Sequence, residues 1–238
     1  MKLHQTCTAA ALGLCFVIAA PSAHAVSVNI VISQIYGGGG NVGATFTNDF
    51  IELFNRDVAP VSLDGWSVQY ASATGSVWQV TNLSGILAPG EFYLIQEAAG
   101  AGGTTSLPTP DAIGTIAMSA NNGKVAVVNT TVALNCSLDC LLNANIIDLV
   151  GYGSTASSFE GDGPAAMLTN TLAALRLADG AQDTDNNAAD FVTGVPNPRN
   201  SAVAETPLPA TLSLFATGLG PLGLIGWRRK KKAAAFAA

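Results

Sequence analysis

Polar and apolar side chains alternate most clearly along the stretch from Asp49 to Tyr70. Residues 50–55 place aromatic and branched apolar side chains in a period of two, which is the period of a β-strand. The pattern stops and then resumes over residues 61–70, around a turn at Asp64-Gly65 where glycine can adopt a positive φ. The stretch therefore predicts a β-hairpin, with Trp66 as its anchor in the core.

The same kind of pattern predicts further strands along the chain. They are expected at Val28–Tyr36, Ser76–Val80, Ile86–Ile95, Ile113–Met118, Lys124–Val128 and Ile146–Tyr152. Turn signals separate them, including Pro89-Gly90 within the third of these segments and a tight hairpin turn at 121–123. No amphipathic helix stands out between Val26 and Glu205, apart from a short helical turn near residues 165–175. Short strands with turn signals between them predict an all-β sandwich.

A glycine-rich loop at residues 37–43 follows the first predicted strand. Gly38, Gly40 and Gly43 match the spacing of a dinucleotide-binding fingerprint, which needs a helix directly after the loop. Residues 44–49 show no helical pattern and lead into another strand. The sequence therefore argues against a nucleotide site.

The N-terminus has the three parts of a secretory signal peptide. Lys2 supplies the positive charge, Ala9–Ala20 holds only small or apolar side chains, and Ala23-His24-Ala25 is a small-x-small cleavage site. Residues 1–25 are therefore predicted to be removed by signal peptidase. A buried N-terminal helix is the alternative.

The C-terminus carries an apolar segment, residues 210–227, followed by a basic tail at residues 228–238. A segment of this length can cross the hydrocarbon core of a bilayer. The basic cluster is expected to stay on the cytoplasmic side. The sequence therefore predicts one transmembrane helix.

The motif in front of this segment resembles the PEP-CTERM sorting signal in its VPLPA-type variant. The resemblance rests on Pro207, Leu208, Pro209 and Ala210, the apolar span, and the basic residues that begin with Arg228 and Arg229. Thr206 stands where that variant usually has Val. The resemblance implies recognition by an exosortase, removal of the helix, and delivery to the surface or matrix of a Gram-negative bacterium. A permanent single-pass anchor is the alternative.

Charge is distributed unevenly between the ends and the middle of the chain. Residues 26–205 contain four Lys and Arg but all sixteen Asp and Glu, a balance of −12. Such a surface repels polyanions, so nucleic acid is not expected as a partner. Cationic partners or divalent metal ions fit this charge better.

Histidine and cysteine narrow the possible chemistry. Both histidines, His4 and His24, lie in the predicted signal peptide, which excludes histidine-based catalysis and imidazole metal sites from the remaining chain. Cys136 and Cys140 are the cysteines that remain. In an exported protein they predict a disulfide; the alternative, half of a thiolate metal site, lacks further ligands.

The middle of the chain resembles the lamin-tail domain over about residues 27–201. The motifs are VISQIYGGGG, DFIELFN, VSLDGW and LAPGEFYLI, followed by IIDLVGYG, LRLADGAQDTDNNAADF and VPNPRNS. The resemblance implies an immunoglobulin-like β-sandwich that acts as a binding or adaptor module. The catalytic domains to which such modules are often fused are not recognisable here, so the resemblance implies no enzymatic activity.

Three sets of residues are candidates for chemistry. Asp183, Asp185, Asn187 and Asp190 have the oxygen-ligand spacing of an incomplete calcium loop, or else form an Asx-rich surface turn. Glu52 either faces solvent, pairs with Arg56 or Arg176, or works with Asp64 as a carboxylate pair for glycoside chemistry. Four aromatic residues could form a carbohydrate platform or belong to the core: Trp66, Trp78, Phe92 and Tyr93.

The sequence as a whole predicts a signal peptide (1–25), a lamin-tail-like β-sandwich (26–201), a linker with the sorting motif (202–209), a transmembrane helix (210–227) and a basic cytoplasmic tail (228–238). The expected function is that of an exported, non-enzymatic binding or adhesion module with an envelope or exopolysaccharide ligand. No cofactor other than calcium is expected. Three alternatives are a carboxylate-dependent polysaccharide hydrolase, a permanently anchored adaptor and a DNA-binding adaptor.

Overall fold

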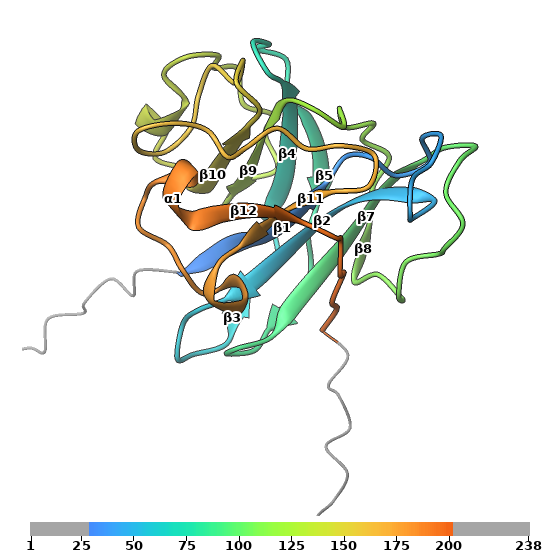
Figure 1. Ribbon diagram of the computed structural model, residues 1–238. Coiled ribbons are helices and arrows are strands. Elements are labelled where there is room, and N and C mark those ends of the chain that lie inside the picture. The colour runs from blue at the N-terminus through green and yellow to red at the C-terminus, as the bar shows by residue number, and fades with distance from the viewer. Residues whose placement is uncertain (1–28, 202–238) are drawn as a thin grey trace, which may run out of the picture.

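The computed structural model describes residues 29–201, which form two β-sheets packed face to face (Figure 1). The larger sheet has the strand order β12-β11-β1-β2-β7-β8, and the smaller has the order β10-β9-β4-β5. A short pair, β3-β6, lies beside them. Neighbouring strands are antiparallel, except that β8 runs parallel to β7. The prediction of an all-β sandwich is confirmed.

The strands are β1 (Ile30–Tyr36), β2 (Asn48–Asn55), β3 (Val61–Ser62), β4 (Ser67–Ser72), β5 (Gln79–Asn82), β6 (Ile86–Leu87), β7 (Phe92–Ala99), β8 (Ala112–Ile113), β9 (Gly123–Val128), β10 (Ile146–Tyr152), β11 (Ala173–Arg176) and β12 (Phe191–Gly194). The helical segments are short: η1 (Cys140–Leu142), η2 (Ala178–Gly180) and α1 (Asn187–Asp190).

The core lies between the two sheets and follows the alternation seen in the sequence. From the larger sheet, Ile51 and Leu53 of β2 point inward, and Val68 of β4 and Val125 of β9 meet them from the smaller sheet. Each of these side chains is fully buried. The period of two also turns Phe50 and its alternate neighbours of β2 to the opposite face of the larger sheet, where a smaller aromatic cluster forms.

The predicted hairpin over Asp49–Tyr70 is wrong. β2 pairs with β1 and β7 in the larger sheet, whereas β4 pairs with β5 and β9 in the smaller one. The connection between them, with its turn at Gly65 (φ 81°), carries the chain from one sheet to the other. Alternation predicts that a strand exists but not which strand it pairs with. Trp66 is half-buried and packs against the edge of the core.

Several other boundaries differ from the prediction. The strand expected at Ser76–Val80 is Gln79–Asn82, and only Ile113 of the expected strand Ile113–Met118 lies in a strand, β8 (Ala112–Ile113). The turn at 121–123 therefore does not close a hairpin. The helical turn expected near 165–175 is wrong, because Ala173–Arg176 is strand β11. Alanine and leucine side chains in so short a segment do not distinguish a strand from a helical turn.

The glycine-rich loop between β1 and β2 is a close-packed backbone crossing. A Cβ at Gly39 would lie 1.9 Å from the backbone of Asn48, and one at Gly40 would lie 2.1 Å from the backbone of Gly100. Gly40 also has a φ of 67°. No helix follows the loop, so the dinucleotide motif is absent and the glycines serve backbone packing.

The predictions for the chain ends lie outside the described residues. They concern the signal peptide at 1–25, the sorting motif at 207–210, the apolar segment at 210–227 and the basic tail at 228–238. Within residues 29–201, no helix is long and apolar enough to cross a membrane.

Candidate functional site

The last described residues, 195–201, cross the outer face of the larger sheet, and we call this segment the strap. Gln34 of β1 holds it with two hydrogen bonds: its side-chain amide donates to the Asn197 carbonyl at 3.0 Å and its oxygen accepts from the Asn197 N–H at 2.8 Å. Ser201 donates to the carboxylate of Asp111 through both its backbone N–H and its hydroxyl. The strap is therefore fixed at both ends.

Glu52 of β2 lies beneath the strap and is fully buried. Arg199 reaches it with its guanidinium at 2.8 Å and with its backbone N–H at 2.6 Å. The Ser33 hydroxyl donates to the same carboxylate at 2.7 Å. Burial raises the pKa of Glu52, and Arg199 opposes that shift.

The partner of Glu52 is therefore Arg199, and the predicted pairing with Arg56 or Arg176 is wrong. The guanidinium carbon of Arg199 also lies 3.5 Å above the Phe92 ring, so the strap makes a cation–π contact on the same sheet face. Asp64, the other member of the predicted carboxylate pair, lies in an exposed turn and accepts from the Gly85 N–H. The two carboxylates share no partner, so the structure does not support a catalytic pair.

A pocket of about 280 Å³ opens between the strap and strands β1, β11 and β12. Its lining combines apolar and polar side chains. The apolar ones are Leu175, Leu177, Ala178 and Val192, and the polar ones include Gln34, Asp179, Asn197 and Arg199. A lining of this kind suits a small ligand with apolar surface and several hydrogen-bonding groups.

The lip of this pocket is a strained turn. Ala178 and Asp179 have φ values of 51° and 56°, and Gly180 follows at 92°. A left-handed backbone conformation costs free energy at any residue other than glycine, and here two such residues are consecutive. Strained backbone of this kind is concentrated at functional sites. The turn presents the Asp179 carboxylate, whose side chain is 87% exposed, to the guanidinium of Arg199.

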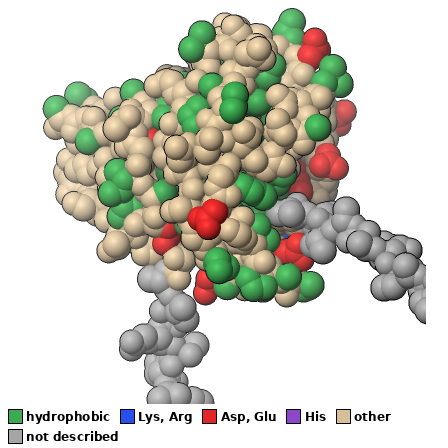
Figure 2. All heavy atoms as spheres, turned by 180° about the vertical axis from the view of Figure 1, so that it is seen from behind, with side chains coloured by type: hydrophobic (Ala, Val, Ile, Leu, Met, Phe, Trp, Pro, Cys, Tyr) green, Lys and Arg blue, Asp and Glu red, His purple; other side chains and the backbone are tan. Residues whose placement is uncertain are grey.

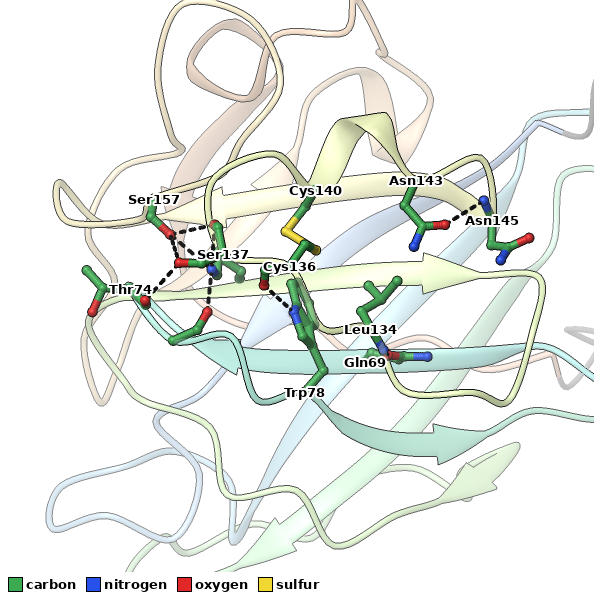
Figure 3. Close-up of a disulfide and its surroundings, with 12 residues drawn as sticks. Gln69, Thr74, Trp78, Leu134, Cys136, Ser137, Cys140, Asn143, Asn145 and Ser157 are labelled. Carbon is green, nitrogen blue, oxygen red and sulfur yellow. Dashed lines mark hydrogen bonds between the residues drawn. A yellow bond between two sulfur atoms is a disulfide. The ribbon is translucent and has the colours of Figure 1, made fainter.

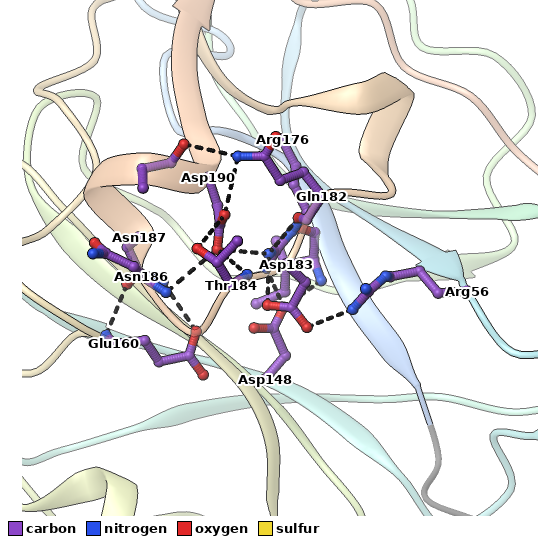
Figure 4. A network of polar contacts seen from close by, with 12 residues as sticks. Arg56, Asp148, Glu160, Arg176, Gln182, Asp183, Thr184, Asn186, Asn187 and Asp190 are labelled. Carbon is purple, nitrogen blue, oxygen red and sulfur yellow. Dashed lines mark hydrogen bonds and ion pairs between the residues drawn. The ribbon is translucent and has the colours of Figure 1, made fainter.

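A second polar cluster surrounds Arg176 (Figure 4). Its guanidinium is fully buried and contacts Asp148 at 2.8 Å and Asp183 at 3.1 Å, with Asp190 at 3.7 Å. Arg56 contacts the other oxygen of Asp183 at 2.6 Å. Two guanidinium groups therefore neutralise most of the carboxylate charge in this cluster.

The residues predicted for calcium do not gather in one place. Asp185 is exposed, and Asn187 is buried between Gly151, Glu160 and Leu149, to which it is hydrogen-bonded. The oxygens of Asp190 accept from the backbone and hydroxyl of Thr184. Burial raises the pKa of Asp190, but these hydrogen bonds outweigh it and the net shift is downward.

The carboxylates that do gather are different ones. Oxygens of Asp148, Glu160 and Asp183 lie within 4.8 Å of one another. Burial and the neighbouring Asp148 raise the pKa of Glu160 to about 8, which makes this group largely neutral at pH 7. Because guanidinium groups already supply positive charge here, the geometry favours a structural cluster over a metal site. The predicted calcium loop has the hydrogen bonds of an Asx-rich turn instead.

The family assignment follows from a match over more than half of the chain and not from one cluster. The family model described as Lamin Tail Domain matches residues 23–154, more than half of the 238 residues. The chain belongs to the lamin tail domain family. Its immunoglobulin-like sandwich agrees with the predicted fold, and the strap, β11 and β12 lie beyond the matched range.

Other comparisons add little about this lamin tail domain. Among solved structures it is similar to a DUF4876 family protein from Bacteroides thetaiotaomicron, with 16% sequence identity, a TM-score of 0.48, and coverage of 76% of this chain and 75% of that chain. So distant a likeness carries no functional information. No curated protein matches the chain.

Cys136 and Cys140 form a disulfide in the long loop between β9 and β10 (Figure 3). The loop lies over the outer face of the smaller sheet, where the indole of Trp78 donates to the Cys136 carbonyl at 2.9 Å. Lys124 is fully buried beside it and donates to the carbonyls of Gly75 and Ser137. These contacts attach the loop to the lamin tail sandwich.

The four aromatic residues proposed for a carbohydrate platform do not form one. Trp78 and Tyr93 are each 4% exposed, and they belong to different clusters. Phe92 stacks on Phe54 with a centroid distance of 4.7 Å and is covered by Arg199. Together with half-buried Trp66, these residues serve the core and the strap, as the alternative prediction stated.

Sequence reasoning missed Arg199, Asp179 and Gln34 as site residues. A usable signal was the scarcity of cations, because a chain with only four Lys and Arg in residues 26–205 must use them where buried carboxylates need a partner. The identity of the partners still depended on the fold.

Proposed function

We propose that this chain is an exported, non-enzymatic binding module of the bacterial envelope or its extracellular matrix, and that the pocket beneath the strap takes the ligand. The observation that carries the proposal is the enclosure of Glu52. Its carboxylate is buried under Arg199 and Ser33, so it has no access to a substrate. A buried, ion-paired carboxylate is poorly suited to acid–base catalysis.

The charge of the surface narrows the ligand class. The described part contains four basic residues, and carboxylates or carbonyls bind each of them. They are Arg56, Lys124, Arg176 and Arg199. Figure 2 shows acidic side chains on the face seen from behind and almost no Lys or Arg surface. Neutral or amine-bearing polysaccharides therefore suit this module better than nucleic acids or acidic polymers.

Binding is tested with residues 26–205, which contain the whole described fold, on a panel of purified neutral, amine-bearing and acidic polysaccharides. We expect retention on at least one neutral or amine-bearing polymer without turnover. Val192→Trp should fill the pocket and remove retention, because Val192 lines it and is 46% exposed. Val77→Trp is the matched control, since Val77 is 82% exposed and does not line the pocket. Retention on no polymer, or turnover abolished by Glu52→Gln in a folded variant, would overturn the proposal.

Export and sorting form the second part of the proposal and are tested with the full chain. In a host with an exosortase, we expect the protein in the medium or matrix without its C-terminal segment; without the enzyme it should stay in the membrane fraction. Replacing Pro207, Leu208 and Pro209 with Ala should block release. Val203→Ala with Glu205→Ala is the control and should not. Release that does not depend on the exosortase would contradict this part.

A further inference from the structure

Two buried carboxyl groups lie on the inner face of the larger sheet, apart from the strap and from the Arg176 cluster. Asp49 of β2 and Glu97 of β7 are 4% and 1% exposed. They occur where the pairing of these two strands is irregular, between the Asn48–Ala99 pair and the Phe50–Gln96 pair. Both therefore belong to the layer between the two sheets.

The two carboxyl groups hold a single segment, residues 114–118, which we call the flap. Glu97 Oε2 accepts from the Ile116 N–H at 2.9 Å, and Asp49 Oδ2 accepts from the Met118 N–H at 2.8 Å. The Ile116 carbonyl accepts from the Ala98 N–H at 3.1 Å. The flap lies outside any named strand, and the two acids accept N–H groups that a partner strand would otherwise take.

The flap closes one part of the core. The side chains of Ile116 and Met118 are 3% and 7% exposed and belong to the main hydrophobic cluster. A Cβ at Gly114 would lie 2.1 Å from Thr81 Oγ1 and 2.2 Å from Glu97 Oε2. The flap therefore packs directly on the Glu97 carboxyl, and whatever charge that group carries acts on the flap.

No cation compensates these acids within the described residues. Asp49 Oδ1 and Glu97 Oε1 are buried without a hydrogen-bond partner there. The ionisable groups whose charges interact with Asp49 are Glu97 and the phenols of Tyr36, Tyr70 and Tyr152. None of these groups carries positive charge, so an ionised Asp49 would be an unpaired buried anion.

The electrostatics agree with this geometry. Burial raises the pKa of Asp49 to about 7, and the charge of Glu97 adds to the shift. Burial likewise raises the pKa of Glu97 to about 7, against the opposing hydrogen bond from the Ile116 N–H.

We propose that Asp49 and Glu97 form a proton-operated clamp that keeps the flap closed when both are protonated and releases it when they ionise. In the closed form each carboxyl keeps its proton, and the oxygen facing the flap accepts a backbone N–H. Loss of the protons leaves two like charges in an apolar layer, and water can reach them only if the flap moves outward. Opening exposes Ile116, Met118 and the core beneath them.

Hydrogen exchange at the Ile116 and Met118 amides tests the clamp between pH 5.5 and 8.5, after correction for the intrinsic exchange rate. The amides of Val125 and Val127 in the central strand β9 serve as the reference for global unfolding. We expect flap protection to fall at least tenfold as the pH rises through about 7, and to stay below β9 protection at every pH because the flap opens without global unfolding. Flap protection that stays constant over this range, or that equals β9 protection at every pH, overturns the proposal.

The double variant Asp49→Asn with Glu97→Gln should abolish this pH dependence, because the neutral amides imitate the protonated acids. Asp64→Asn is the matched control, since Asp64 is exposed and does not contact the flap. An unchanged pH response in the double variant overturns the clamp. If that variant does not fold, carboxyl NMR titration of the unmodified protein decides: midpoints near 7 for both acids support the clamp, and midpoints below 5 overturn it.

Discussion

The Arg176 cluster and the Asp49–Glu97 pair both contain buried carboxyl groups, but only the Arg176 cluster supplies a positively charged partner. Asp148 shares its environment with a fully buried guanidinium at 2.8 Å, whereas neither Asp49 nor Glu97 has a cation nearby in the part of the chain described. Burial raises the pKa of all three carboxyl groups, and Arg176 opposes the shift at Asp148 only. The counter-ion, and not burial, decides whether such a group serves as a fixed cross-link or responds to protons.

The largest effect is expected from Arg176→Met. Removing the guanidinium leaves Asp148 and Asp183 without their shared partner in a buried site, so the free energy of unfolding should fall by about 3–5 kcal/mol. Urea denaturation at pH 7, followed by tryptophan fluorescence, measures the loss. A loss below about 1 kcal/mol would show that the cluster is more hydrated than the structure indicates.

The raised pKa values of Asp49 and Glu97 determine whether the free energy of unfolding rises or falls with pH. Folding raises the pKa values of Asp49 and Glu97 from 3.8 and 4.5 to about 7, so the folded state holds protons that the unfolded state has released. Stability should therefore fall as the pH rises from about 4 to about 7. Between pH 6 and pH 8 each of the two groups should lose about one pKa unit of stabilisation, so the total loss should be on the order of 3 kcal/mol, given about 1.4 kcal/mol per pKa unit.

Chemical denaturation of the unmodified protein at several pH values measures this slope. In the Asp49→Asn, Glu97→Gln variant the slope should become smaller but not vanish, because the pKa of Glu160 is also raised, to about 8. Stability that increases from pH 5 to pH 8 would contradict the assignment.

Lys124 is the reverse case, a buried cation held by neutral acceptors. Its ammonium donates to the carbonyls of Gly75 and Ser137 and to the Ser157 hydroxyl, at 2.8 to 3.0 Å. Lys124→Met should cost about 1–3 kcal/mol because the carbonyls lose their donor. Thermal unfolding measures the loss, and Ser157→Ala, which removes only one acceptor, should cost less. Equal losses in the two variants would mean that the carbonyl contacts contribute little.

The smallest effect is expected from Arg56→Met, at the exposed edge of the Arg176 cluster. Its side chain is 22% exposed, and solvent screens its contact with Asp183, so the loss should be about 1 kcal/mol or less. The same urea titration measures it. A loss comparable to that of Arg176→Met would mean that the cluster depends on both guanidinium groups together.

Sequence pattern predicted which segments are strands more successfully than how they associate. The alternation at Ile146–Tyr152 matches strand β10 residue for residue, and that at Lys124–Val128 differs from β9 by one residue. Periodicity did not predict the short strands β11 and β12. Four residues are too few for a period to be distinguished from chance.

The candidate site was less predictable than the fold. Asp183 and Asp190 were singled out for calcium, yet they lie beside Arg176, which sequence reasoning had considered only as a partner of Glu52. The true partner of Glu52 lies 147 residues away in the strap. Spacing along the chain describes local loops, whereas an ion pair depends on which distant segments the sheet brings together.

The sequence by itself determined the alternation that builds the sandwich, the scarcity of cations, the absence of histidine beyond residue 24, and the family to which the chain belongs. The tertiary structure alone decided that β2 and β4 enter different sheets, that Arg199 closes over Glu52, and that Asp49 and Glu97 hold one flap without a counter-ion. Periodicity is a local property of the backbone and can be read over a few residues. Charge pairing and burial depend on distances through space, which exist only once the strands have packed.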